Sequence, residues 1–325
     1  MDAPHVVYKF GGTSVGSVPR FQTVIDILRR TAQAGRVVAI VSAQGKVTRR
    51  LSAGMEAFAT RASERTDVLD TLISDLRERH GAQAKAVLSP TRCDEYMAHA
   101  ADRLSALREV FGRVAREGFT PAARDAVLAT GEQLSVPMVT LALRDAGIEA
   151  PLCDATTLVQ TDDTFGEATV DVEDTRARVR AWYEELPAHA VPVVAGFIGA
   201  TADGRTTTLG FEGSDYSAAL FAHILRAGCL TRYTDVDGLY TADPDTDPSA
   251  ERLDRLSMED AFARTEAGRL GMHPKTLRPL VKADIPMQVR SIDDPEGTGT
   301  QIVPAAASNV LLTPPVGQAA PSSLP

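Results

Sequence analysis

Three features are scarce in this chain of 325 residues: cysteine, net positive charge and long apolar runs. Cys93, Cys153 and Cys229 are far apart, odd in number and without metal-ligand spacing, so we expect apolar core residues in a reducing cytosol. No apolar run approaches the ~20 residues of a membrane span, and the N-terminus has no signal-peptide core. These absences predict a cytoplasmic protein without membrane contacts.

The charge balance also limits the partners. The chain has 43 acidic and 34 basic residues and a net charge of −9, which argues against nucleic-acid or anionic-membrane surfaces. A nucleotide ligand would therefore need a local cationic patch. The length suits two lobes, which we place at residues 1–200 and 201–303. Residues 304–325 are mainly Ala, Pro, Ser and Gly and are predicted to form a flexible tail.

The first 16 residues contain the most informative stretch. Residues 6–10 have the pattern of a short buried strand that runs into Gly11-Gly12 and then a helix. Backbone N–H groups in such a turn can approach an anion closely, and Lys9 adds a point charge. The spacing is neither a Walker P-loop nor a dinucleotide fingerprint. A phosphate cradle and a simple tight connection both remain open at this point.

The next segments predict a βαβ unit. Pro19 suits the first turn of a helix that ends near Gly35, and residues 36–42 form a continuous apolar run of strand length. Strand, helix and strand in this order indicate a parallel sheet buried on both faces, hence an α/β fold. The loop at 42–48 follows the carboxyl end of the second strand, where ligands of open α/β sheets collect.

Residues 50–147 are predicted to be a mostly helical elaboration with breaks near Gly81, 89–90 and 118–121. The pair Gly131-Glu132 is predicted to begin a helix within it. Glu132 could point its carboxylate at the sheet edge, or it could simply be a first-turn glutamate favoured by the helix dipole.

Strand patterns return in the second half. A second glycine turn, at 210–217, opens onto an apolar helix, and there Ser214 and Asp215 could be helix caps or functional groups. The other strands are predicted at 148–153, 168–172, 191–199, 206–209, 230–240 and 285–289, and short helices at 257–267 and 273–282.

Two glycine-rich helix starts and one lysine imply an anionic ligand held between two halves of one sheet. Phosphoryl transfer to a carboxylate would fit this set, because a carboxylate is already ionised at neutral pH and needs no general base. Catalysis would then rest on positioning, on screening by lysine and backbone N–H groups, and on Mg²⁺ held through phosphate oxygens and water. No His/Ser/Asp triad is visible.

Seven motifs, in order, resemble those of the aspartate kinases of the amino-acid kinase superfamily over about residues 5–303. They are Lys9 to Val15, Val41 to Ala43, Gly131-Glu132, Gly196 to Gly199, Gly213 to Ser217, Thr234 to Gly238 with Tyr240, and His273-Pro274 with Thr276. The resemblance implies a three-layer αβα sandwich with a large, mainly parallel sheet. It also implies ATP-dependent phosphorylation of the aspartate side-chain carboxylate to 4-phosphoaspartate, at the start of lysine, threonine and methionine synthesis.

The resemblance also implies residue roles. Lys9 would stabilise the transferring phosphoryl group, and Ser214 and Asp215 would organise the reaction centre. Glu132 would meet the ammonium of the amino acid, with Thr48 and Phe197 around it. The nucleotide would contact Lys9, Gly11, Gly12, Ser14, Ser42, Thr234, Asp235, Tyr240 and Arg269. No side chain would bind the metal directly.

Four positions depart from the family pattern. Phe211-Glu212 stands where the family has Arg-Gly, so a cation that holds a substrate carboxylate is lost. Leu270 and Asp245 stand where the family has a lysine and an arginine near the nucleotide. Lys46, Arg269 and Lys275 are candidate replacements.

The region after Val303 is too short and too polar to form the paired ACT regulatory domains of most aspartate kinases. We therefore expect no feedback inhibition by lysine or threonine through such domains, and a homodimer by family analogy. Two further hypotheses stay open: a carboxylate kinase for another amino acid in a specialised pathway, and a non-catalytic homologue that binds a nucleotide or a partner.

Overall fold

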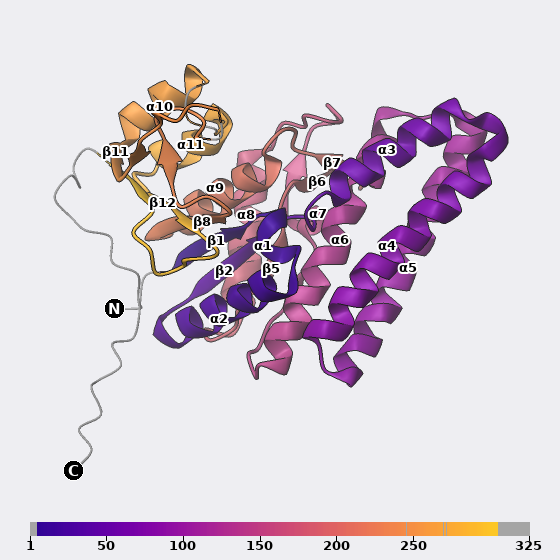
Figure 1. Ribbon diagram of the computed structural model, residues 1–325, viewed down its shortest axis with the longest axis horizontal. Coiled ribbons are helices and arrows are strands. Elements are labelled where there is room, and N and C mark those ends of the chain that lie inside the picture. The colour runs from indigo at the N-terminus through magenta and orange to yellow at the C-terminus, as the bar shows by residue number, and fades with distance from the viewer. Residues whose placement is uncertain (1–4, 245, 269, 271, 305–325) are drawn as a thin grey trace, which may run out of the picture.

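One eight-stranded sheet forms the centre of the computed structural model, which describes residues 5–244, 246–268, 270 and 272–304. The strand order is β11-β13-β12-β8-β1-β2-β5-β3 (Figure 1). The strands are β1 (Val6–Phe10), β2 (Val37–Val41), β3 (Leu152–Cys153), β5 (Val193–Ala195), β8 (Cys229–Thr234), β11 (Arg255–Ser257), β12 (Met287–Ser291) and β13 (Thr300–Val303). Only β12 and β13 pair antiparallel, so the predicted mainly parallel sheet is confirmed.

β1 and β2 are buried at every residue, as expected for central strands with both faces covered. β1 lies between β2 and β8 and pairs in parallel with both. Strands from the two predicted lobes therefore share one sheet, and the carboxyl ends of β1, β2 and β8 meet at the same edge.

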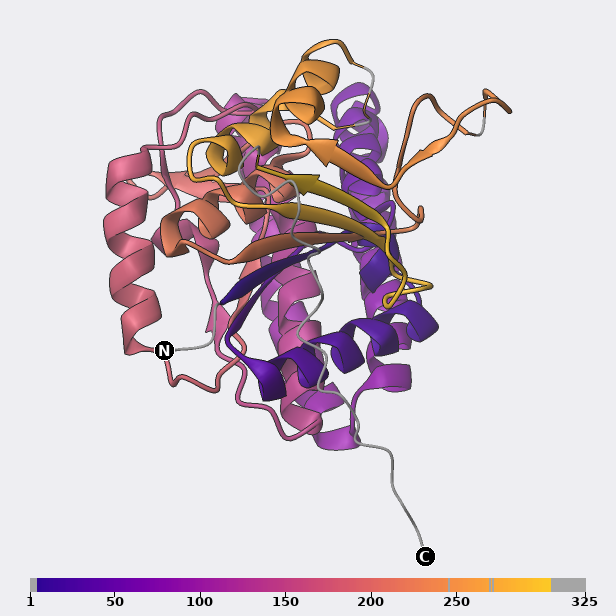
Figure 2. The same ribbon diagram turned by 90° about the vertical axis from the view of Figure 1, so that its left-hand side faces the viewer.

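Helices cover both faces and complete the predicted three layers (Figures 1 and 2). On one face lie α2 (Val18–Ala34) and α6 (Pro121–Asp145), which contact β2. On the other lies α9 (Gly213–Leu225), which contacts β1, β2 and β8. α8 (Val172–Glu185) and α11 (Pro274–Val281) pack beside α9.

The helical elaboration consists of α3 (Val47–Thr60), the 3₁₀ turn η1 (Ala62–Glu64), α4 (Arg65–Val87) and α5 (Pro90–Glu117), which stand outside α6 (Figure 1). The predicted helical content of this region is confirmed. The predicted break near Gly81 is wrong, because α4 continues through this glycine, which packs against Met97. The break instead falls at η1.

α6 also corrects an expectation about apolar runs. By length and composition this helix could cross a membrane, although 83% of its most apolar 18-residue window is buried inside the protein. Such a helix is the expected central helix of a large core. Its apolar residues are interrupted by Gly131 and Glu132, which is why no continuous run was visible in the sequence.

The smaller elements complete the fold. They are the sheet of β4 (Gln160–Thr161), β6 (Ile198–Thr201) and β7 (Thr206–Thr208), the hairpin of β9 (Leu239–Tyr240) and β10 (Arg252–Leu253), and the helices α1 (Gly12–Val15), α7 (Ala155–Leu158) and α10 (Met258–Glu266).

The predicted strand at 168–172 is wrong. Within this range Val170 makes one isolated bridge, and α8 begins at Val172 because Asp171 caps it.

Candidate active site

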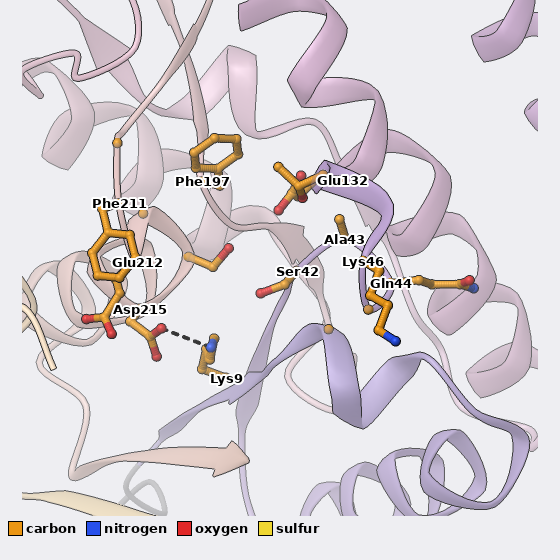
Figure 3. A pocket seen from close by; sticks show the side chains of 16 residues that line it. Lys9, Ser42, Ala43, Gln44, Lys46, Glu132, Phe197, Phe211, Glu212 and Asp215 are labelled. Carbon is orange, nitrogen blue, oxygen red and sulfur yellow. Dashed lines mark hydrogen bonds and ion pairs between the residues drawn. The ribbon is translucent and has the colours of Figure 1, made fainter. Parts of the chain in front are cut away.

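A cleft of about 370 Å³ opens at the carboxyl ends of β1 and β2 (Figure 3). Residues from both glycine turns line it, among them Lys9 and Gly12 from the first and Ser214 and Asp215 from the second. The sequence-based expectation that the two turns share one cleft is therefore confirmed. Ser42, Thr48, Glu132 and Phe197 line the same cleft, and their roles toward the nucleotide and the amino acid stay predictions.

A buried ionic cluster joins the two turns. The Lys9 Nζ donates to Asp215 Oδ2 at 3.0 Å, and the Arg232 Nε lies 3.1 Å from Asp215 Oδ1 without hydrogen-bond geometry. Burial alone would raise the pKa of Asp215, but the charges of Arg232 and Lys9 outweigh it and hold that pKa below its usual range. Burial lowers the pKa of Lys9, and Asp215 opposes this only in part. Asp215 is thus an ionised anchor that fixes the lysine at the cleft floor.

Glu132 supplies a second buried carboxylate. It lies in the middle of α6, which begins at Pro121, so the first-turn interpretation of this residue is wrong. Its side chain is buried, and its Oε2 has no hydrogen-bond partner among the described residues. Burial raises the pKa of Glu132 to about 8, against the opposing effects of the Ala43 backbone, the Lys9 charge and the Ser214 side chain. A buried carboxyl group with an unused oxygen is suited to receive a cationic group of a ligand.

Backbone strain is concentrated around the cleft. Among the described residues, five that are not glycine have positive φ, and three of them line the cleft: Lys46 and Phe197 at 70° and Glu212 at 54°. Such conformations are costly for side chains with a Cβ and cluster at functional sites. Glu212 is also the N-cap of α9 and makes no side-chain cap bond, so the interpretation of Ser214 as a helix cap is wrong.

Two glycines are required by close packing at the cleft. A Cβ on Gly12 would lie 2.6 Å from the Ala43 carbonyl oxygen, and a Cβ on Gly196 would lie 2.7 Å from the Ser214 Cβ. Neither position therefore has room for a side chain. The glycines let the loops after β1, β2 and β5 approach one another and α9, which gives the cleft its narrow floor.

Of the two remaining residues of the predicted phosphate cradle, Gly11 lies beside Lys9 and Ser14 lies outside the cleft lining. The Gly11 backbone adjoins Lys9, since a Cβ there would lie 3.6 Å from the ammonium nitrogen. Ser14 is buried, and its hydroxyl donates to the Tyr233 carbonyl at 3.4 Å, so it is not in the cleft lining. The phosphate-binding role of Ser14 stays a prediction.

The predicted nucleotide side has its own cavity of about 540 Å³, lined by Thr234 and Tyr240 and by the buried Leu270. Asp235 is not in this lining, and its carboxylate accepts from the Thr234 hydroxyl at 3.1 Å. Arg269, and Asp245 among the departures, lie outside the described residues.

Arg232 is the functional candidate that the sequence analysis missed. It lines the second cavity and contacts Asp215 in the first, so it connects the two. Its signal was an arginine between two buried residues of the strand β8, where a charge that is largely removed from water needs a partner.

One departure from the family pattern, Phe211-Glu212, lies at the mouth of the cleft. Phe211 is 76% exposed, and the Glu212 carboxylate accepts the backbone N–H of His273 at 2.6 Å, which ties the turn to α11. Lys46 also lines the cleft, and its side chain has no ion pair or hydrogen bond with a described residue. It is the cleft's free cation within the described part of the chain.

Comparison with known proteins gives this architecture a family. Residues 4–291 match the sequence model of the Amino acid kinase family, so the chain belongs to that family. The solved structure of E. coli aspartokinase III in complex with aspartate and ADP matches with a TM-score of 0.81 at 32% identity, over 92% of this chain and 64% of that one. The predicted amino-acid kinase fold is thereby confirmed.

Curated relatives point to one branch of the family. Lysine-sensitive aspartokinase 3 of Escherichia coli (strain K12) is 34% identical over 299 residues, which are 91% of this chain and 64% of that protein. Bifunctional aspartokinase/homoserine dehydrogenase 1, chloroplastic, of Arabidopsis thaliana is 31% identical over 298 residues, 91% of this chain and 32% of that protein. The chain thus spans 32% to 64% of the length of these relatives.

Proposed function

We propose that this protein transfers the γ-phosphoryl group of ATP to the side-chain carboxylate of L-aspartate, which yields 4-phospho-L-aspartate and ADP. The observation that carries the proposal is the single cleft in which Lys9 from one glycine turn meets Asp215 from the other. The similarity to aspartokinases, one of them solved with aspartate and ADP, supports the choice of substrates.

The reaction needs little covalent chemistry from the protein. A carboxylate oxygen of the acceptor attacks the γ-phosphorus, the bond to the bridging oxygen of ADP breaks, and no proton is transferred. Lys9 would bind the transferring phosphoryl oxygens and reduce the repulsion between two anions. Asp215 holds the lysine ammonium in place through the 3.0 Å contact, and Arg232 keeps Asp215 ionised.

The amino acid would lie between Glu132 and the loop at 42–48. The unpartnered Glu132 oxygen would accept the ammonium group, while Thr48 and Phe197 would bound the side chain. Lys46 is the cation available to bind the carboxylate of the amino acid that is not phosphorylated. It would take the place of the family arginine, where this chain has Phe211.

The residues also fit Mg²⁺ that arrives with the nucleotide. No group of three or more His, Cys, Asp or Glu side chains converges to hold a metal within the described part of the chain. The ion would therefore be held by phosphate oxygens and water, where it would neutralise phosphate charge.

A hydroxamate assay tests the proposal. The protein is incubated with Mg-ATP, hydroxylamine and single amino acids, and hydroxamate from any acyl phosphate is measured. We expect product with L-aspartate. No product with aspartate or any other acid, despite measurable ATP binding, would instead support a non-catalytic homologue.

A second candidate is a carboxylate kinase for another amino acid. The exposed Phe211 at the cleft mouth favours it, because a phenyl ring cannot bind a second carboxylate. Hydroxamate formed with another amino acid, and none with aspartate, would select this function.

A further inference from the structure

A third cavity lies at the edge of the sheet opposite the cleft, where the chain enters β8 and β12, and its lining is mainly cationic. It encloses about 610 Å³ between the carboxyl ends of α9 and α11 and the side of α8. Its lining contains four permanent cations, Arg176, Arg180, Arg226 and Lys282, and one carboxylate, Asp284. This concentration of positive charge stands out in a chain whose net charge is −9.

The cavity shares no lining residue with the active-site cleft. α9 connects the two, because its first residues line the cleft and His223, near its last turn, lines the basic cavity. A helix of 13 residues is about 20 Å long, so the two sites are well separated.

Helix ends explain part of the charge. Cations near a helix C-terminus are favourable, and the Arg180 Nε donates to the Ile224 carbonyl at 3.2 Å. The His223 ring lies 3.0 Å from the Pro279 carbonyl through Nδ1, so Nδ1 is the donor and Nε2 can accept the N–H of Arg176 at 3.4 Å. Arg176 is also held by Glu173, at 2.6 and 2.7 Å.

These contacts leave most of the donors unused. Arg226 and Lys282 have no side-chain hydrogen bond or ion pair with any described residue, and both are exposed. The terminal nitrogens of Arg180 are likewise without a described acceptor. Two free guanidinium edges and an ammonium around one concave space match the oxygens of a tetrahedral dianion.

We propose that this basic cavity binds a small phosphate-bearing anion at a site separate from the active-site cleft. The volume lies within the range of small-molecule sites, which is about 300–1,000 Å³. Arg180, Arg226 and Lys282 bind the phosphate oxygens, and Arg176, fixed by Glu173 and His223, closes one wall.

The test measures binding of inorganic phosphate and, separately, of glycerol 3-phosphate by calorimetry at constant ionic strength. The Lys9→Ala variant is included, because it weakens phosphate binding in the cleft. We expect saturable binding that survives Lys9→Ala and is at least about tenfold weaker in the double variant Arg226→Gln/Lys282→Gln. Tighter binding of the ester would identify the ligand as an organic phosphate, and equal or weaker binding would identify it as free phosphate.

A matched control removes the same charges elsewhere. Lys85 on α4 and Arg113 on α5 are exposed and have no described partner, so Lys85→Gln/Arg113→Gln lowers the net charge equally. Equal weakening by both double variants would show diffuse surface attraction and overturn the proposal. Absence of saturable binding, or its loss in Lys9→Ala, would also overturn it.

Discussion

The two glycine turns of the cleft have the same design but differ in how closely they follow the aspartate kinase pattern. Each connects a strand to a helix N-terminus, and each supplies one partner of the pair between Lys9 and Asp215. The first turn keeps the family residues and has ordinary helical geometry after Gly11. The second contains the exposed Phe211 and the left-handed Glu212, which its bond to His273 stabilises. The end of the cleft proposed to bind the phosphoryl group is thus preserved, while the end proposed to face the acceptor has changed.

The largest expected effect tests the preserved end. Lys9→Ala removes the ammonium proposed to bind the phosphoryl group, so kcat should fall about 10³-fold. Circular dichroism and thermal unfolding should show an intact fold, because Arg232 still neutralises Asp215. Lys85→Ala, on the exposed side of α4, is the control and should keep activity. Near-normal turnover of Lys9→Ala would remove this residue from the mechanism.

The second prediction concerns the buried carboxyl group of Glu132 in the cleft. Its pKa of about 8 means that the empty cleft holds a protonated carboxyl group at neutral pH. An ammonium ligand requires the ionised form, so aspartate affinity should rise about tenfold per pH unit up to pH 8 and then level off. Glu132→Gln should abolish this dependence, and succinate, which lacks the ammonium group, should show none as a competitive ligand. A pH-independent affinity for aspartate would contradict the assignment.

The same group predicts the pH dependence of stability. The folded state binds the Glu132 proton more tightly than the unfolded state, so this contribution to stability is lost as pH rises from the usual carboxyl pKa of 4.5 towards 8. Urea unfolding of the free protein at pH 6 and pH 8 measures it. Glu132→Gln should lose less stability across this interval than the unmodified chain.

A smaller effect is expected at the altered turn. Phe211→Arg restores a guanidinium group at the cleft mouth and should lower KM for aspartate about tenfold with little change in kcat. Phe211→Leu removes the ring without adding charge and should leave KM high. If both variants resemble the unmodified protein, position 211 does not contact the acceptor.

The sequence was sufficient for the parts of the fold that local patterns determine. The continuous apolar runs of β1 and β2 and the proline and glycine that bound α2 predicted the βαβ unit correctly. The first glycine turn was also predicted correctly, because its conformation depends on residues that are adjacent in the sequence. By contrast, the position of Glu132 within its helix was predicted wrongly. The helix α6 begins eleven residues earlier, at Pro121, and because it has apolar residues on most sides, no clear periodicity marks its start.

Long-range contacts account for most of what was missed. Arg232 becomes informative only when β8 lies beside β1, which brings it to Asp215. The strand expected at 168–172 does not form, because Asp171 caps α8 and the helix begins at Val172. The basic cavity combines α8, α9 and α11, whose residues are separated by up to about a hundred positions, and no local pattern would join them.

The position of β1 between β2 and β8 has a consequence for synthesis and folding. Lys9 and Asp215 are 206 residues apart in the chain, and β1 gains its second neighbour only when residues 229–234 are available. A ribosome-bound fragment that ends before α9 would expose one edge of β1 and would lack Asp215, the partner of the buried Lys9. The cleft is therefore assembled late, and chains truncated in the middle should be recognised by chaperones or proteases rather than retain partial activity.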